Sequence, residues 1–187
     1  MLGGTTHERL ACSSGLEIGH DLILSKSLGI EATAIIASEK RVELLAIGLS
    51  TGFLDICGDF LHAPGISVTA MHDSTEGGVA TGLCELAAAS DVGLEIAGDA
   101  LPIATATQRL CSEYDLDPLG VISSSALLIG CTAHITTAIL SALRVADIAV
   151  THIGSIRETS FGLQLRRDDQ HMPLPVFPAD EITHLFT

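Results

Sequence analysis

The sequence predicts an α/β fold (α+β in the wider sense), with helices packed on a mixed β-sheet. Short apolar, β-prone runs alternate along the chain with longer runs whose apolar residues have helical spacing. In the clearest helical run, apolar residues recur every three or four positions, at Ile135, Ala138, Ile139, Ala142 and Leu143. Because aromatic residues make up 3% of a chain that is 47% apolar, the core has to be built from aliphatic side chains.

The first part of the chain is predicted to hold a linker, one buried strand and several helical segments. Gly- and Ser-rich sequence without a clear period indicates the linker, and a short apolar run indicates the strand. In order, we expect a linker over residues 1–20, a strand over 21–25, a helix over 28–36, helical pieces over 40–49 and 51–61, and a turn at 62–65.

The second part is predicted to alternate strands and helices and to end in an extended tail. Gly93 is expected just after the end of one helix, Pro102 near the start of another, and Asp180 as the cap of a last helical turn. The expected strands cover residues 66–71, 94–97, 126–131, 148–153 (closed by Gly154) and 161–165 (an edge strand), and the expected helices cover 79–90, 103–114 and 135–143. We therefore expect one domain over 21–165, followed by a tail over 166–187.

Composition and charge exclude several classes of function. The formal net charge of −14 repels phosphate backbones, so no nucleic-acid partner is expected. No run of 18 apolar residues occurs and the N-terminus does not resemble a signal peptide, so we expect no membrane association and a cytoplasmic location. Five scattered cysteines without a C-x-x-C pair argue against a disulfide framework or a zinc ribbon.

The densest chemical feature is the segment that precedes the helix predicted over 79–90. It is read as a strand, a polar loop, two glycines and the helix, an arrangement that directs backbone N–H groups at an anion. The residues predicted to bind a phosphate-bearing ligand are His72, Asp73, Thr75, Gly77 and Gly78. The glycines would let the backbone approach the ligand closely, and Thr75 could donate its hydroxyl.

Two alternatives remain open on these residues alone, and a separate serine run is a further candidate. The segment could be a capped helix start, with Asp73 or Thr75 as the N-cap. It could also be a metal site of His72, Asp73 and Glu76, although no second cluster of ligands completes a shell, and no resident metal is expected. The three hydroxyls of Ser123–Ser125, placed before a buried strand, could line a pocket. The run 166–169 is interpreted as a solvated charge cluster.

The run Met71–Ile96 resembles the C-terminal domain of the AIR synthase (PurM)-like superfamily, most closely its HypE-like and AIR synthase-related branches, whose loop reads M-H-D-x-T-x-G-G. Residues 21–33, 115–120 and 151–156 are similar to other landmarks of that domain, and the resemblance covers about residues 15–160. It implies the superfamily's fold, with ATP and Mg²⁺ as cofactors.

The resemblance implies that the chain contributes to an ATP-dependent, phosphoryl-activating site. That site is expected to be incomplete without an N-terminal half, supplied by a separate subunit or within a homodimer, and no residue is assigned a catalytic role. The ligand is expected to be a small phosphate-bearing molecule. The alternatives are a non-catalytic module that binds a ligand or a partner, and a metal hydrolase.

Overall fold

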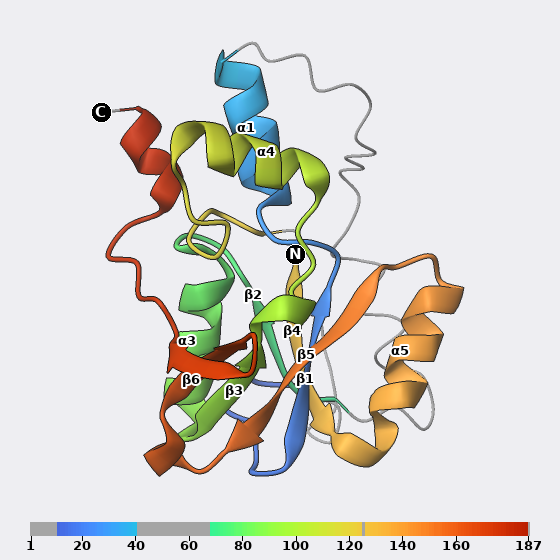
Figure 1. Cartoon of the computed structure of the whole chain (residues 1–187). Coiled ribbons are helices and arrows are strands. Elements are labelled where there is room, and N and C mark those ends of the chain that lie inside the picture. Colours follow the sequence, from blue (N-terminus) through green and yellow to red (C-terminus); the bar gives the residue numbers. More distant parts are fainter. Residues whose placement is uncertain (1–10, 41–67, 125, 187) are drawn as a thin grey trace.

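The computed structural model describes residues 11–40, 68–124 and 126–186. These residues form a mixed seven-stranded sheet with helices on both faces and at one end (Figure 1), which confirms the predicted fold class. The strands are β1 (His20–Ser25), β2 (Val68–Asp73), β3 (Gly93–Ala97), β4 (Leu127–Thr132), β5 (Val150–Arg157), β6 (Leu163–Arg167) and β7 (Gln170–Pro173). The α-helices are α1 (Ile30–Lys40), α3 (Gly78–Ser90), α4 (Thr105–Tyr114) and α5 (Thr136–Val145), and short 3₁₀ turns include η2 (Gly98–Ala100) and η5 (Glu181–Leu185).

The strand order is β2-β4-β1-β5-β3-β6-β7. Strand β4 is antiparallel to both of its neighbours, with Leu128 opposite Leu24 of β1 and Leu127 opposite Asp73 of β2. Strands β1 and β2 therefore run in the same direction and end at the same edge of the sheet. The one parallel pair among the described strands is β3 with β6.

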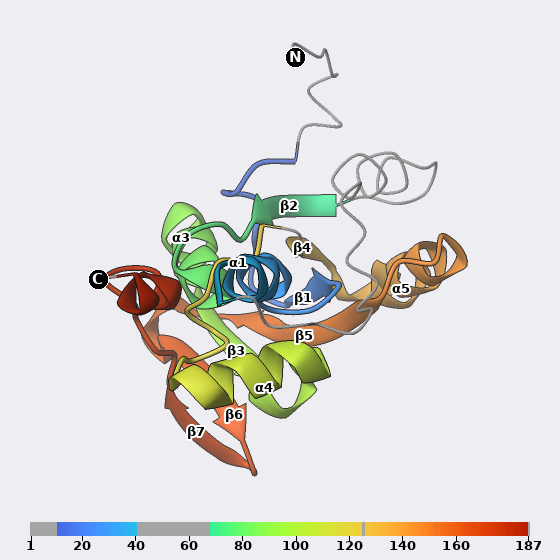
Figure 2. The ribbon, with the colours of Figure 1, turned by 90° about the horizontal axis from the view of Figure 1, so that it is seen from above.

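Strand alternation buries both faces of the sheet. On β1, Leu22 and Leu24 face a core that includes Leu83 and Leu86 of α3, whereas Ile23 faces a core that includes Ile139 of α5. Helix α5 thus covers the opposite face from α3. A third cluster joins α1 to α4, which lie beside each other at one end of the sheet (Figures 1 and 2). This helix pair stands over the strand ends.

Several predicted boundaries were wrong. The left-handed residue at the end of α3 is Asp91, because Gly93 already belongs to β3, where a Cβ would lie 2.3 Å from the Glu158 carbonyl oxygen. Strand β5 continues past Gly154 to Arg157. Strand β6 is not an edge strand, because β7 pairs with it.

One further prediction is confirmed, and others concern segments outside the described residues. Asp180 does cap the last helical turn, since its carboxylate accepts the Ile182 N–H at 3.1 Å. The helical pieces expected over residues 40–49 and 51–61 and the turn at 62–65 lie outside the described residues, except Lys40, the last residue of α1. Within the described part of the chain, no helix has the length and apolar character needed to cross a membrane.

Candidate functional site

Polar side chains gather at the sheet edge where β1 and β2 end and β4 begins. Lys26 follows β1, Asp73 ends β2, Ser124 lies in the loop before β4, and Glu31 lies in the first turn of α1. We call Lys26, Glu31, Asp73 and Ser124 the strand-end cluster. It forms because two strands that run in the same direction deliver their last residues to one edge, below the start of α1.

Asp73 is the least satisfied member of the strand-end cluster. Its Oδ1 is buried and has no hydrogen-bond partner among the described residues. Burial raises the pKa of the Asp73 carboxyl above its ordinary value, and the nearby Glu31 carboxylate adds to this, while His72 and Lys26 act in the opposite direction. A half-buried acid with an unpaired oxygen is costly in a folded chain, and such groups concentrate at functional sites.

Ser74, the next residue along the chain, carries a second orphaned group. Its hydroxyl is buried without a hydrogen-bond partner among the described residues. It lies under α3, where a Cβ added at Gly82 would be 3.0 Å from it. The Ser74 backbone is fully engaged, since its N–H donates to Ala126 and its carbonyl oxygen accepts the Ser123 N–H at 3.2 Å. The hydroxyl is therefore held in place by the backbone and not by a partner of its own.

The serine run that was predicted as a possible pocket lining is split between two roles. The Ser123 hydroxyl is fully buried, accepts the Gly29 N–H at 2.8 Å and donates to the Val121 carbonyl oxygen at 2.9 Å. It therefore holds the start of α1 in place. The Ser124 hydroxyl donates to the Glu31 carboxylate and belongs to the strand-end cluster. Ser125 lies outside the described residues.

His72 and Asp73 are neighbours in sequence but have different surroundings. The His72 ring lies between Glu85 Oε2, 2.7 Å from Nε2, and Ser13 Oγ, 3.2 Å from Nδ1. Both ring nitrogens are thus engaged, and the ring is tied to α3. Asp73 makes no such hydrogen bond to a described residue, and the charges that act on its carboxyl are those of His72, Glu31 and Lys26. Because successive side chains of a strand point to opposite faces, β2 separates the two.

The glycine pair is held by the protein itself. The Gly77 N–H donates to Asp180 Oδ2 at 2.8 Å, and the Gly78 N–H donates to the Thr75 carbonyl oxygen at 3.1 Å. Gly77, not Asp73 or Thr75, is the N-cap of α3, and a glycine has no side chain of its own to cap the helix, so the capping alternative was wrong. Both glycines have left-handed backbones, which explains why glycine is needed at each position. The Thr75 side chain is exposed.

A metal site of His72, Asp73 and Glu76 finds no support. Within the described ranges, no group of three or more His, Cys, Asp or Glu side chains is arranged to hold a metal ion. Glu76 is exposed, and both nitrogens of the His72 ring bond to protein atoms.

Three residues that the sequence does not assign to this site contribute to it: Lys26, Glu31 and Asp180. Lys26 carried a readable signal, because it is a charged residue placed directly after a buried strand. It also has a left-handed backbone, with φ of 60°. Glu31 and Asp180 carried no such signal, because tertiary packing alone brings them to β2 and to the glycine pair.

Comparison with known proteins assigns the fold to a family. The family described as "AIR synthase related protein, C-terminal domain" matches residues 17–165. The chain is 31% identical over 134 residues to the carbamoyl dehydratase HypE of Cupriavidus necator, which covers 70% of this chain and 38% of that protein.

Solved structures with the same fold support this family assignment. Escherichia coli HypE, a hydrogenase maturation protein, has a TM-score of 0.79 and 26% identity, covering 92% of this chain and 54% of the other. A HypE structure in complex with ATP also has a TM-score of 0.79, at 20% identity, with 89% and 53% of the two chains covered. The chain thus spans about half the length of these structures. The resemblance inferred from Met71–Ile96 is confirmed: the chain belongs to the AIR synthase related family and carries its C-terminal domain.

Proposed function

We propose that this domain forms one wall of an ATP-dependent, phosphoryl-activating site and that the strand-end cluster faces the nucleotide. The observation that carries the proposal is Asp73, whose buried Oδ1 has no hydrogen-bond partner among the described residues. Support also comes from the family match and from the neighbour of the same fold solved with ATP. The reaction would activate an oxygen of a carboxylate or amide by transfer of a phosphoryl group.

The donor set fits Mg²⁺ brought in with a nucleotide. Mg²⁺ is usually bound through one or two protein carboxylates together with phosphate oxygens and water, not by a cage made of protein alone. Asp73 and Glu31 are close enough for the Glu31 carboxylate to raise the pKa of Asp73, and both are oxygen ligands. A bound cation would relieve the repulsion between them, and Lys26 would face the negative phosphate.

The five residues predicted to bind phosphate contribute unequally to this proposal. Asp73 has an unpaired oxygen, and Thr75 presents an exposed hydroxyl. The Gly77 N–H is bonded to Asp180, so a phosphate could use it only after that carboxylate moved away. Gly78 shapes the turn, and His72 is positioned to orient β2 against α3. We therefore propose Asp73 and Thr75 as ligand contacts and the other three as their support.

Titration calorimetry of the whole chain with ATP and Mg²⁺ tests the proposal. We expect binding, and we expect Asp73→Asn to weaken it about ten-fold or more, because hydrogen bonds to charged groups contribute about 1.5–3 kcal/mol. Asp147→Asn is the matched control, since it removes the same charge from an exposed residue after α5 and should leave binding unchanged. Equal weakening by both variants would point to general electrostatics and contradict the proposed site.

A second titration includes the N-terminal half of a full-length relative as a separate polypeptide. We propose that such a half, or a second copy of this chain, completes the site, because Lys26 is the one basic side chain in the strand-end cluster. Tighter binding with the added half is the expected result. Absence of ATP binding both with and without it would refute the ATP site.

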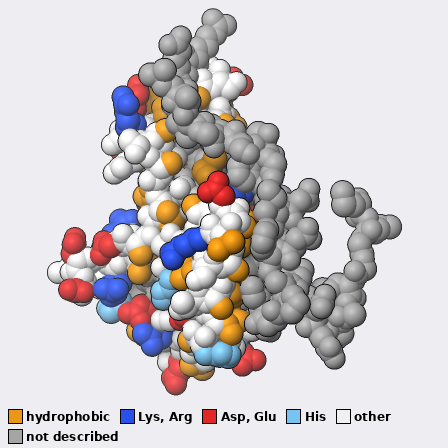
Figure 3. Space-filling model, turned by 90° about the vertical axis from the view of Figure 1, so that its right-hand side faces the viewer, with side chains coloured by type: hydrophobic (Ala, Val, Ile, Leu, Met, Phe, Trp, Pro, Cys, Tyr) orange, Lys and Arg blue, Asp and Glu red, His pale blue; other side chains and the backbone are white. Residues whose placement is uncertain are grey.

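The alternative is a non-catalytic module that binds a ligand without chemistry. The hydrogen bond from the Gly77 N–H to Asp180 favours this alternative, because the N-terminus of α3 already holds a carboxylate where a phosphate would bind. Docking of a protein on an apolar surface is less well supported. Large exposed apolar side chains are scattered over separate elements, as with Ile18, Val145 and Val176. On the face that Figure 3 shows, the described residues present small apolar areas divided by backbone and by other side chains. ATP binding without any ATP turnover, with the added half present, would favour this alternative.

We also propose a cytoplasmic location. Each cysteine that the structure describes, namely Cys12, Cys84, Cys111 and Cys131, is a free thiol, as expected in a reducing compartment.

A further inference from the structure

A cavity of about 440 Å³ lies apart from the strand-end cluster, between the turn that follows α4, the end of β6 and the start of η5. Leu101, Ile103, Leu116 and Leu119 supply apolar surface in this cavity. The volume falls in the range of about 300–1,000 Å³ that is usual for small-molecule sites. The cavity is therefore large enough for a compact ligand with an apolar part.

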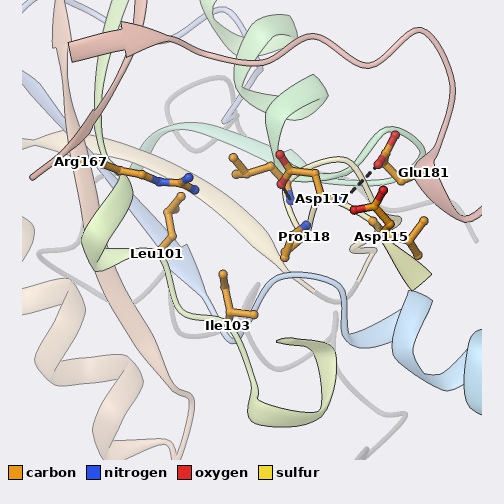
Figure 4. A pocket seen from close by; sticks show the side chains of 9 residues that line it. Leu101, Ile103, Asp115, Asp117, Pro118, Arg167 and Glu181 are labelled. Atoms are coloured by element: carbon orange, nitrogen blue, oxygen red, sulfur yellow. Dashed lines mark hydrogen bonds between the residues drawn. The ribbon is translucent and has the colours of Figure 1, made fainter. Parts of the chain in front are cut away.

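Charges of opposite sign face each other across the cavity. Arg167 extends into it from one side, and Asp115, Asp117 and Glu181 lie on the other, with Ile103 and Pro118 between them (Figure 4). None of these acids forms an ion pair with Arg167, although ion pairs in the described chain extend to 3.9 Å. Glu181 pairs with His184 instead, with 3.6 Å between Oε1 and Nε2. The cavity therefore has a basic wall at Arg167 and an acidic wall opposite, and no ion pair joins the two.

The acidic wall is fixed in place by the backbone. Glu181 Oε2 accepts the Asp117 N–H at 3.1 Å, and Asp117 Oδ1 accepts the Leu119 N–H at 2.9 Å. Its negative potential also reaches the neighbouring Cys111 thiol. Burial raises the pKa of that thiol to about 11, with the Asp117 and Glu181 carboxylates contributing. The side chain of Asp115 has no hydrogen bond or ion pair to any residue in the described part of the chain and can turn to a ligand.

The basic wall is fixed by packing. The Arg167 stem lies against Gly98, where an added Cβ would come within 2.6 Å of Cγ and 3.0 Å of Nε. The half-buried guanidinium makes no hydrogen bond or ion pair with the residues that the structure describes. Its neighbour Arg166, in contrast, pairs with Asp169 Oδ1 at 3.2 Å. A planar guanidinium is suited to receive a carboxylate through two parallel hydrogen bonds.

We propose that this cavity binds a small zwitterion with an apolar body, of the class of the apolar amino acids. The carboxylate pairs with Arg167, the ammonium group faces Asp115, Asp117 and Glu181, and the side chain contacts the leucine-rich surface. A dianionic phosphate is disfavoured, because three carboxylates lie on the opposite wall. A simple cation would leave the guanidinium unused. This site is independent of the proposed ATP site and stands if that proposal fails.

Titration of the ¹⁵N-labelled chain, followed by NMR, tests the proposal with three matched compounds. Phenylalanine carries both charges, 3-phenylpropanoate lacks the ammonium group, and phenethylamine lacks the carboxylate. We expect phenylalanine to shift the backbone signals of Leu101, Ile103, Leu116 and Leu119, and each single-charge analogue to bind at least about ten-fold more weakly, the scale of a lost charge-assisted hydrogen bond.

Variants divide the site into its two walls. Arg167→Gln should weaken phenylalanine binding about ten-fold and leave phenethylamine unaffected, since only the carboxylate uses the guanidinium. Asp115→Asn should weaken both amines, and an asparagine tolerates the left-handed backbone of Asp115 at the end of α4. The matched control is Arg166→Gln, which removes the same charge from the preceding residue and should change nothing.

Three results would overturn the proposal. In the first, phenylalanine at its solubility limit leaves these signals in place. In the second, phenethylamine binds as tightly as phenylalanine, which would make the cavity a site for cations. In the third, Arg166→Gln weakens binding as much as Arg167→Gln, which would reduce the effect to overall charge.

Discussion

Two carboxylates on different strands of this sheet have opposite surroundings. Glu95 of β3 is surrounded by partners: its Oε2 accepts the Arg157 Nε–H at 2.8 Å, and its Oε1 lies 2.9 Å from His171 Nε2. These hydrogen bonds, from His171 first and Arg157 second, lower the pKa of Glu95. Asp73 of β2 has a buried oxygen without a partner among the described residues, and burial raises its pKa.

The contrast separates a structural acid from a candidate functional one. The Glu95 cluster, consisting of Glu95, Arg157 and His171, ties β3, β5 and β7 together, with Phe161 beside Arg157 and His171 at 5.9 Å from each. Each charged group there finds its partner within the fold. At Asp73 the fold leaves a group unsatisfied, and a ligand carrying a cation or a hydrogen-bond donor would satisfy it. Three substitutions test this difference, taken from the largest expected effect to the smallest.

Gly78→Ala should have the largest effect, because it disrupts the turn that carries Asp73 into α3. The added Cβ would lie 2.4 Å from the Leu119 carbonyl oxygen, in a backbone with φ of 66°. A left-handed alanine costs about 1–2 kcal/mol and overpacking about 1–3 more. We expect a loss of about 3 kcal/mol, measured as a fall of about 10 °C in Tm.

Gly19→Ala is the control for that substitution. Gly19 also has a left-handed backbone, with φ of 86°, but nothing lies within 4 Å of an added Cβ. It should cost only the backbone strain of about 1–2 kcal/mol. If both variants lose the same stability, the close packing of Gly78 against Leu119 contributes nothing.

Glu95→Gln should have an intermediate effect. A folded-state pKa below the usual value means that Glu95 adds stability above its ordinary pKa, and that this is lost as the pH falls through the folded-state pKa. Because the cluster is partly exposed, we expect a loss of about 1 kcal/mol at neutral pH, shrinking in acid. Chemical denaturation at several pH values measures it. The control is Glu158→Gln, at an exposed residue just after β5. If Glu95→Gln loses no stability, the hydrogen bonds of Glu95 to its partners do not stabilise the fold.

Asp73→Asn should have the smallest effect, and the opposite sign. Because its folded-state pKa is raised, the folded chain keeps a proton that the unfolded chain releases from about pH 3.8 upward, so Asp73 costs stability as the pH rises through that window. The variant should therefore be slightly more stable at neutral pH, by a few tenths of a kcal/mol, and equal to the original chain in acid. Asp147→Asn corrects for the change in net charge. A clearly destabilised Asp73→Asn would make Asp73 a structural acid and remove the contrast with Glu95.

Much of the fold was predictable because local sequence determines it. The apolar run at residues 21–25 became β1, the helical stripe at 135–143 became α5, and Asp180 became a helix cap. These features depend on neighbours within a few positions. The prediction that Gly93 ends a helix was wrong for a tertiary reason, because the nearby Glu158 carbonyl oxygen selects glycine there.

The candidate site was predictable only in part. Asp73 stood out in the sequence, whereas Glu31 reaches it through the packing of α1 over the strand ends. The run 166–169 was interpreted as a solvated charge cluster, which describes the exposed Arg166–Asp169 pair but not Arg167, whose side chain lines the cavity. Alternate residues at a strand end point to different faces, so a charge pattern alone does not separate the two arginines.

The sequence by itself determined the alternation of strands and helices, the glycines of the turn before α3 and the resemblance of Met71–Ile96 to a family. Each of these depends on residues that are close together along the chain. Tertiary structure alone decided which groups in that turn remain unsatisfied. Asp180, 103 residues away, takes the Gly77 N–H, and no described side chain takes Asp73 Oδ1. Hydrogen-bond partners are assigned by distance in space, and only the folded chain fixes those distances.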